Sequence, residues 1–123
     1  MRILVIDDDA LVGKSLARLL RAHDVEVMAG AANALEPICA GDYDAIFCDL
    51  MMPGVSGPEL FAMVEARNPG VADRFIFVTG GAYTPELSEF IAGGQRRVLN
   101  KPFDRDTLQA MLDSIGPGLA QGR

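Results

Sequence analysis

Five short apolar runs alternate along this chain with segments of helical periodicity. The runs are residues 3–6, 25–28, 44–48, 75–78 and 97–99. Such alternation predicts a parallel sheet whose strands are joined by right-handed helical crossovers. Ile3-Leu4-Val5-Ile6 is apolar at every position, which is typical of a strand covered on both faces. We therefore expect an α/β domain, a doubly wound (βα)5 parallel sheet.

The segments between the runs carry helix signals. Segment 10–22 has apolar residues on one face, and Pro37 in segment 31–40 indicates a late start or a bend there. A third helix is expected from Pro58 to Arg67, stopped by Asn68-Pro69-Gly70. A fourth begins at Thr84-Pro85 and ends at Gly93-Gly94, and a fifth is capped by Asp104 and ends at Gly116-Pro117-Gly118. We expect one domain over residues 1–116 and a C-terminal tail over 117–123.

Composition excludes several classes of protein. The chain has 123 residues, enough for one domain, and half of them are hydrophobic. Its net charge of -6 disfavours direct binding to nucleic acid, which requires a basic surface. No apolar run approaches membrane-spanning length, no signal peptide is visible, and Cys39 and Cys48 form no disulfide framework. We therefore expect a cytoplasmic protein that contacts no membrane.

Polar residues with possible chemical roles follow four of the predicted strands. Asp7 and Asp8 follow the first strand, Asp49 the third, Thr79 the fourth and Lys101 the fifth. A parallel sheet places all these strand ends on one edge. In the flavodoxin-like order 2-1-3-4-5, the first and third strands are neighbours at the switch point, where ligands bind. We therefore expect the three carboxylates to converge.

Three carboxylates in a small site require a counter-charge, and the alternative is a strongly raised pKa on one of them. Oxygen ligands without a nearby His or Cys suit a hard cation, and Mg²⁺ is the expected one. The Lys101 ammonium and the Thr79 hydroxyl could pair with the oxygens of a phosphoryl group on Asp49. For Asp7-Asp8-Asp9 alone, the alternative is a solvated helix N-terminus. Together these residues favour Asp49 as a phosphoryl acceptor.

The chain resembles the receiver domain of two-component response regulators from residue 2 to about residue 115. The matching motifs are Ile6-Asp7-Asp8-Asp9, Asp49-Leu50-Met51-Met52-Pro53-Gly54, Gly57, Val78-Thr79-Gly80 and Lys101-Pro102-Phe103. Each motif is weak alone, but their order and separation are specific. The resemblance implies a phosphorylation-controlled conformational switch, which is not itself an enzyme although it would assist its own phosphorylation and dephosphorylation.

The family's residue roles transfer by position. The resemblance implies that Asp49 is the phosphoacceptor, that Asp8 binds Mg²⁺ directly and that Asp7 usually acts through water. Met51 would lend its backbone carbonyl to the metal. Thr79 matches the switch hydroxyl and Lys101 the family's lysine, with a cis Lys101–Pro102 bond. The phosphoryl donor would be a sensor histidine kinase or a histidine phosphotransfer protein, and phosphorylation-dependent dimerisation is compatible with the family.

Three positions, at Val98, Met51 and Gly81, bear on how this chain would differ from the receiver-domain family. Val98 stands where the family usually has an aromatic residue, so the usual aromatic rotamer switch is not expected. The loop after Thr79, with Gly81 and Tyr83, becomes the candidate segment that changes conformation on phosphorylation. Met51 and Gly81 offer no side-chain hydrogen bond to a water near the acyl phosphate. Whether the chain is a stand-alone regulator or the receiver of a hybrid histidine kinase stays open.

The sequence is less compatible with three other functions. A hydrolase of the haloacid dehalogenase type requires a second Asp two residues after the nucleophile, where this chain has Met51. A flavodoxin-like FMN binder requires a loop rich in hydroxyls and glycine after the first strand, where this chain has three acids. A receiver-shaped interaction module without phosphorylation is opposed by the intact set of Asp8, Asp49, Thr79 and Lys101.

Overall fold

A five-stranded parallel sheet forms the centre of the molecule. The computed structural model describes residues 1–80, 84–94 and 96–121. The strands are β1 (Arg2–Ile6), β2 (Asp24–Met28), β3 (Ala45–Asp49), β4 (Phe75–Thr79) and β5 (Arg97–Asn100). Their order is β2-β1-β3-β4-β5, which confirms the predicted flavodoxin-like sheet. Asp49 and Thr79 are the last residues of their strands, one position beyond the apolar runs.

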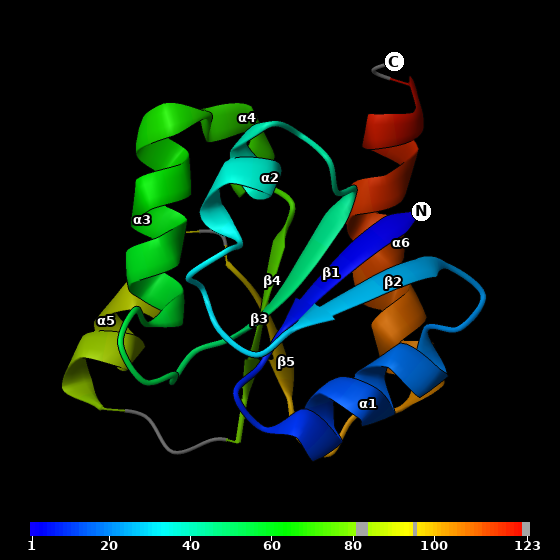
Figure 1. The fold of residues 1–123 in the computed structure, drawn as a ribbon, viewed down its shortest axis with the longest axis horizontal. Helices are drawn as coiled ribbons and strands as arrows, with labels where there is room; N and C mark the ends of the chain where they lie inside the picture. The colour runs from blue at the N-terminus through cyan, green and yellow to red at the C-terminus, as the bar shows by residue number, and fades with distance from the viewer. Residues whose placement is uncertain (81–83, 95, 122–123) are drawn as a thin grey trace.

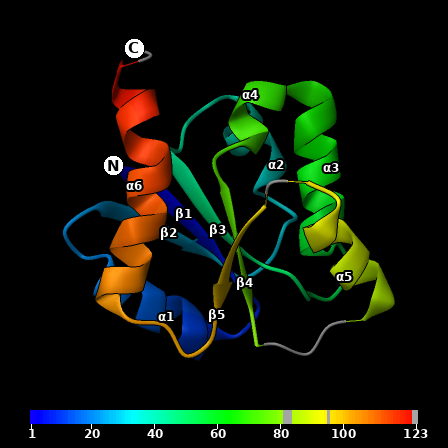
Figure 2. The ribbon, with the colours of Figure 1, turned by 180° about the vertical axis from the view of Figure 1, so that it is seen from behind.

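Helices cover both faces of the sheet, as the two opposite views in Figures 1 and 2 show. Helices α1 (Ala10–Leu19) and α6 (Arg105–Gln121) lie on one face. The other face carries α2 (Leu35–Cys39), α3 (Gly57–Arg67), α4 (Pro69–Ala72) and α5 (Pro85–Ala92). The short helix α4 was not predicted. Asn68 does end α3, but Pro69 then begins another turn, because proline suits the first position of a helix.

Helix α1 ends at Leu19, three residues before its predicted end, and the structure also tests the predicted boundaries of α2 and α6. Helix α2 begins only at Leu35, which confirms the late start and places Pro37 in the first turn, where a helix needs no backbone N–H. The predicted end of the last helix at residues 116–118 was wrong, because α6 continues to Gln121. Glycine and proline lower helix stability without forbidding a helix, and burial of Leu112 and Ile115 anchors the preceding turns.

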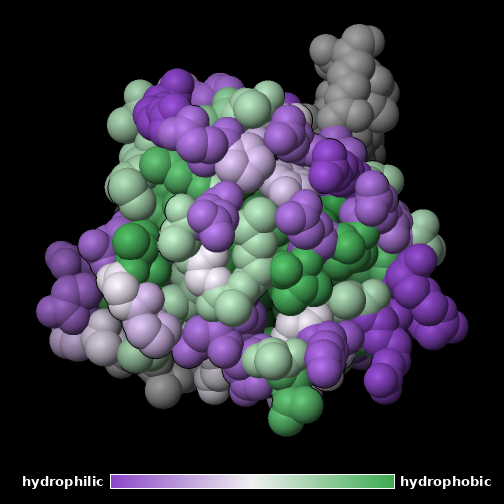
Figure 3. Space-filling model, viewed as in Figure 1, coloured by the Kyte–Doolittle hydropathy of each residue, from purple (hydrophilic) through white to green (hydrophobic). Residues whose placement is uncertain are grey.

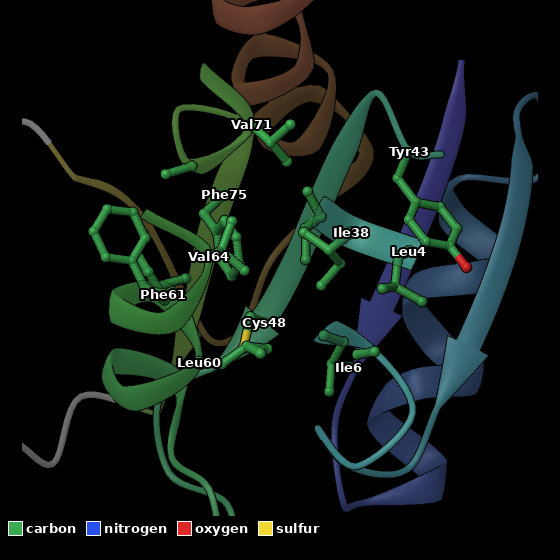
Figure 4. Packing of buried hydrophobic residues seen from close by; sticks show 14 of the residues in the cluster. Leu4, Ile6, Ile38, Tyr43, Cys48, Leu60, Phe61, Val64, Val71 and Phe75 are labelled. Carbon is green, nitrogen blue, oxygen red and sulfur yellow. The ribbon is translucent and has the colours of Figure 1, made fainter. Parts of the chain in front are cut away.

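The core has two layers, one on each face of the sheet. Alternate residues of β1 supply them: Leu4 and Ile6 enter the layer beneath α2 and α3, whereas Ile3 and Val5 enter the layer beneath α1 and α6. Figure 4 shows Leu4 and Ile6 in the first layer together with Cys48 of β3 and side chains of α3. Burial on both faces holds the strand ends in fixed register, and that register positions the acidic residues.

The surface shown in Figure 3 mixes hydrophilic side chains with smaller hydrophobic patches. Among the described residues, none of the helices combines the length and the apolarity needed to cross a bilayer. Two large apolar side chains near the carboxyl ends of the strands are well exposed: Leu11 is 74% exposed and Met51 is 55% exposed. Both lie close in sequence to the acidic residues.

Candidate functional site

Three carboxylates meet where β1 and β3 end. In the pairing of these strands, Ile6 lies opposite Cys48, so Asp7 and Asp49 follow at neighbouring positions. One carboxylate oxygen each from Asp7, Asp8 and Asp49 lies within 4.8 Å of the others. The predicted convergence of these residues is therefore present in the structure.

Asp7 is the most buried of the three acids, with 2% of its surface exposed. Its Oδ1 atom accepts a hydrogen bond of 2.8 Å from the backbone N–H of Asp9. Its Oδ2 atom is buried and has no hydrogen-bond partner among the described residues. Because a buried carboxylate oxygen without a partner is costly, the geometry suits a cation at this point. The atoms that could bind the cation in this cluster are carboxylate oxygens, which fits Mg²⁺.

Burial and mutual repulsion perturb these carboxylates. Burial, followed by the negative charge of Asp7, raises the pKa of Asp49 to about 6, while the Met51 N–H and the Lys101 charge oppose that rise. Burial also raises the pKa of Asp7, opposed by the Asp9 N–H and by Lys101. The Met51 N–H lies 3.4 Å from Asp49 Oδ1. Positive charge at this edge of the sheet therefore favours the ionised form of both acids.

The loop after Asp49 is held at both ends. The Leu50 N–H donates to the carbonyl oxygen of Val78 at 3.1 Å, which extends the β3–β4 pairing past Asp49. Gly54 has a φ of 79°, a left-handed conformation that glycine adopts at low cost. Ser56 and Glu59 then form a capping box at the start of α3. The loop thus leaves β3 in a fixed direction and presents the backbone of Met51 beside Asp49.

Thr79 and Lys101 come from neighbouring strands. Thr79 is 4% exposed and lies opposite Asn100 in the β4–β5 pairing. The backbone N–H of Lys101 donates to the carbonyl oxygen of Thr79 at 2.8 Å, so the two residues are held together through the main chain. The Lys101–Pro102 bond is cis, as predicted.

The aromatic residues near β5 differ from the arrangement expected in the family. Val98 lies opposite Phe77 and points away from the layer that contains Leu99. The Phe77 ring lies 5.0 Å from the ring of Phe90 in α5. Aromatic packing at this edge therefore comes from β4 and α5. The predicted roles of Gly81 and Tyr83 concern positions outside the described residues.

One interaction in this region was not predicted. The guanidinium carbon of Arg96 lies 4.5 Å from the ring centroid of Phe61 and 4.4 Å from that of Phe90. Arg96 Nε also donates to the carbonyl oxygen of Phe90 at 3.3 Å. The three residues come from α3, α5 and the segment before β5, so no local spacing in the sequence indicates that they meet.

The motifs at these strand ends match a known family model. The model of the response regulator receiver domain matches residues 3–113. The chain belongs to this family. Among curated relatives of this receiver domain, the transcriptional regulatory protein TcrA of Mycobacterium tuberculosis is 35% identical over 118 residues, which are 94% of this chain and 46% of TcrA. FixJ of Azorhizobium caulinodans is 37% identical over 122 residues, 97% of this chain and 57% of FixJ. The receiver domain thus spans about half the length of these relatives.

Solved structures share the fold. The receiver domain of the sensor histidine kinase PA1611 from Pseudomonas aeruginosa has a TM-score of 0.78 at 24% identity, covering 93% of this chain and 95% of that one. That structure has a magnesium ion coordinated in its active site cleft. A receiver domain from Clostridium thermocellum has a TM-score of 0.83 at 21% identity, covering 99% and 98% of the two chains. At these identities, the likeness establishes the fold.

Proposed function

We propose that this receiver domain accepts a phosphoryl group on Asp49 from a phosphohistidine, in a Mg²⁺-dependent reaction. The observation that carries the proposal is the carboxylate cluster at the ends of β1 and β3, whose three oxygens lie within 4.8 Å of one another. Within that cluster, Asp7 Oδ2 is buried and has no hydrogen-bond partner among the described residues. A structural cluster would be expected to pair that oxygen, whereas a binding site leaves it for a ligand.

Asp7, Asp8 and Asp49 would hold the Mg²⁺, together with the backbone carbonyl of Met51. Bound there, Mg²⁺ supplies positive charge that offsets the negative charge of the phosphoryl oxygens during transfer. The magnesium ion in the PA1611 receiver domain supports this assignment by analogy of fold. Met51 is exposed, so this part of the loop beside Asp49 is accessible to a phosphodonor.

The chemistry follows from the residues around Asp49. A carboxylate oxygen of Asp49 attacks the phosphorus atom of the phosphohistidine, and an oxygen–phosphorus bond forms as the phosphorus–nitrogen bond breaks. The electron pair of that broken bond stays on the ring nitrogen, so a phosphohistidine that is protonated on its other ring nitrogen leaves as neutral histidine. Lys101 offsets charge on one phosphoryl oxygen, and the Thr79 hydroxyl donates to another.

The partner in this proposal is a sensor histidine kinase or a histidine phosphotransfer protein. The acyl phosphate then acts as a switch, because its oxygens recruit Thr79 and Lys101 and so bias the neighbouring loops. We class the receiver domain as a phosphoacceptor that assists its own phosphorylation, not as an enzyme acting on a separate substrate. Dimerisation after phosphorylation is one form that the output could take.

Incubation with acetyl phosphate and Mg²⁺, followed by intact-mass spectrometry, tests the proposal. We expect the mass of one phosphoryl group on the native chain and none on Asp49→Asn. Asp42→Asn, which neutralises an exposed acid between α2 and β3, is the matched control and should label like the native chain. Absence of label on the native chain, while a known receiver domain is labelled in parallel, would overturn the proposal. So would labelling that persists in EDTA.

A further inference from the structure

An apolar groove of about 660 Å³ lies beside the acidic cluster, between the loop after Asp49 and the start of α5. Figures 1 and 2 both place α5 next to the end of α3 at which that loop arrives. Its apolar lining includes Met51 and Met52 from the loop, Pro58 from the first turn of α3, and Leu87 from α5. This set of residues is called the Met51–Leu87 groove below. Its volume is in the range of sites that bind small ligands or anchoring side chains.

Three of the four polar side chains that line the groove form hydrogen bonds at the starts of helices. Ser56 Oγ accepts from the Glu59 N–H at 3.2 Å, and Glu59 Oε1 accepts from the Ser56 N–H at 3.1 Å. Thr84 Oγ1 accepts from the Leu87 N–H at 3.2 Å. The exposed Glu86 carboxylate, in the first turn of α5, forms no such cap with any residue that the structure describes. Glu86 is therefore the lining side chain best placed to interact with an occupant.

The charged side chains among the described lining residues of the groove are both acidic. Glu59 and Glu86 line it, and none of the described lining residues is basic. Met51 also joins the groove to the carboxylate cluster, because its N–H lies 3.4 Å from Asp49 Oδ1. An apolar surface with an acidic rim is complementary to an apolar group that carries a neighbouring positive charge. It disfavours an acidic occupant by repulsion and by desolvation of the carboxylates.

We propose that the Met51–Leu87 groove is a docking site for a polypeptide segment of a partner, in which an apolar anchor side chain is flanked by lysine or arginine. The anchor would enter between Met51 and Leu87, and the flanking cation would pair with Glu86. Paired methionines suit this role, because their flexible thioether side chains adapt to differently shaped anchors. The docking does not require phosphorylation of Asp49, so it stands apart from the proposed function.

NMR titration of the methyl groups of the unphosphorylated chain tests this proposal. The probe is an acetylated and amidated five-residue peptide with a phenylalanine between two leucines, and with arginine and lysine at its ends. We expect saturable shifts of the methyl signals of Met51, Met52 and Leu87, with smaller changes elsewhere. The same peptide with glutamate at both ends should bind at least tenfold more weakly, because like charges then meet at the rim.

Matched variants locate the contact. Glu86→Gln should weaken binding of the basic peptide about threefold, the effect of one exposed ion pair, whereas Glu89→Gln on the same helix should not. Met51→Ser should weaken binding further, and Met63→Ser, at an exposed methionine of α3 outside the groove, should leave it unchanged. Equal binding of the acidic and basic peptides, absence of saturation, or equal effects of the paired variants would overturn the proposal.

Discussion

A Cβ atom built on Gly57 would lie 2.6 Å from the backbone carbonyl oxygen of Asp49 and 3.1 Å from Leu50 Cα. Glycine at this position lets the first turn of α3 approach the end of β3 more closely than any other residue allows. We therefore expect Gly57→Ala to destabilise the fold by about 2 kcal/mol, in the range measured for overpacking, and to displace Asp49. Chemical denaturation measures the free energy of unfolding, and acetyl phosphate labelling reports on Asp49.

Gly30→Ala is the control for that substitution. No atom lies within 4 Å of a Cβ built on Gly30, and its φ is not positive. This variant should unfold at the denaturant concentration of the native chain and should label normally. Equal stability of Gly57→Ala and Gly30→Ala would show that the close approach at Gly57 has no energetic consequence.

The raised pKa of Asp49 makes stability depend on pH. Its folded-state pKa is about 6, compared with 3.8 for an unperturbed aspartate, so its ionisation costs folding free energy as pH rises through about 6. The shift corresponds to at most about 3 kcal/mol, and solvent screening of this half-buried group reduces it to about 1 kcal/mol. Without Mg²⁺, Asp49→Asn should therefore unfold at higher temperature than the native chain at pH 7, with little difference at pH 4. A lower melting temperature of Asp49→Asn at pH 7 would contradict this expectation.

Addition of Mg²⁺ should stabilise the native chain. A cation that binds only the folded state adds about 2.7 kcal/mol at a concentration of one hundred times its dissociation constant. Asp8→Asn removes one carboxylate of the cluster, so the rise in melting temperature at a fixed Mg²⁺ concentration should largely disappear in this variant. Asp42→Asn should respond to Mg²⁺ like the native chain. An equal response of all three chains would place the cation elsewhere.

Met51 should determine how long the phosphoryl group persists on Asp49. Its side chain is 55% exposed beside Asp49 and offers no hydrogen bond that could position an attacking water. We expect Met51→Asn to shorten the lifetime of the phosphorylated form several-fold, measured by loss of the phosphoryl mass after removal of acetyl phosphate. Met63→Asn, at an exposed methionine of α3, is the control. An unchanged lifetime in Met51→Asn would exclude this position from control of hydrolysis.

The sheet and the convergence of its strand ends could be predicted because local pattern and topology agree. Apolar runs such as Ile3–Ile6 indicate buried strands, and a parallel sheet necessarily brings Asp7 and Asp49 to one edge once the strand order is known. Helix boundaries were less predictable. The extension of α6 beyond residue 116 runs against the local propensity of glycine and proline, and the four-residue helix α4 is too short to show a periodic pattern.

Features that depend on how segments distant in sequence pack against each other could not be predicted from the sequence. Gly57 was recognised as part of a motif, but its contact with the Asp49 backbone is visible only once α3 is packed against β3. The buried Asp7 Oδ2 atom and the Met51–Leu87 groove likewise arise from the packing of segments that are distant in sequence. The sequence therefore indicates the candidate residues for a chemical role, and the structure adds the residues that hold these candidates in place.

Arg96 should stabilise α5 through its position between two rings. Its guanidinium carbon lies 4.5 Å from the Phe61 centroid and 4.4 Å from the Phe90 centroid, and Nε donates to the Phe90 carbonyl at the end of α5. Leu87 is the one fully buried residue of α5, and Phe90 and Ile91 are only partly buried where they pack against the core, so a contact that holds Phe90 in place should matter for the helix. Arg96→Ala should cost about 1–2 kcal/mol of unfolding free energy, and Arg96→Lys should be intermediate, because an ammonium cannot stack as a plane between rings.

Hydrogen exchange distinguishes a local effect of Arg96 from a global one. In Arg96→Ala, the amides of residues 88–92 should exchange faster than in the native chain, while those of β1 and β3 should change only as much as global stability does. Arg21→Ala, which removes an exposed arginine just after α1, is the control and should leave α5 unchanged. If Arg96→Ala and Arg21→Ala have the same stability and the same exchange in α5, the contacts with Phe61 and Phe90 do not anchor this helix.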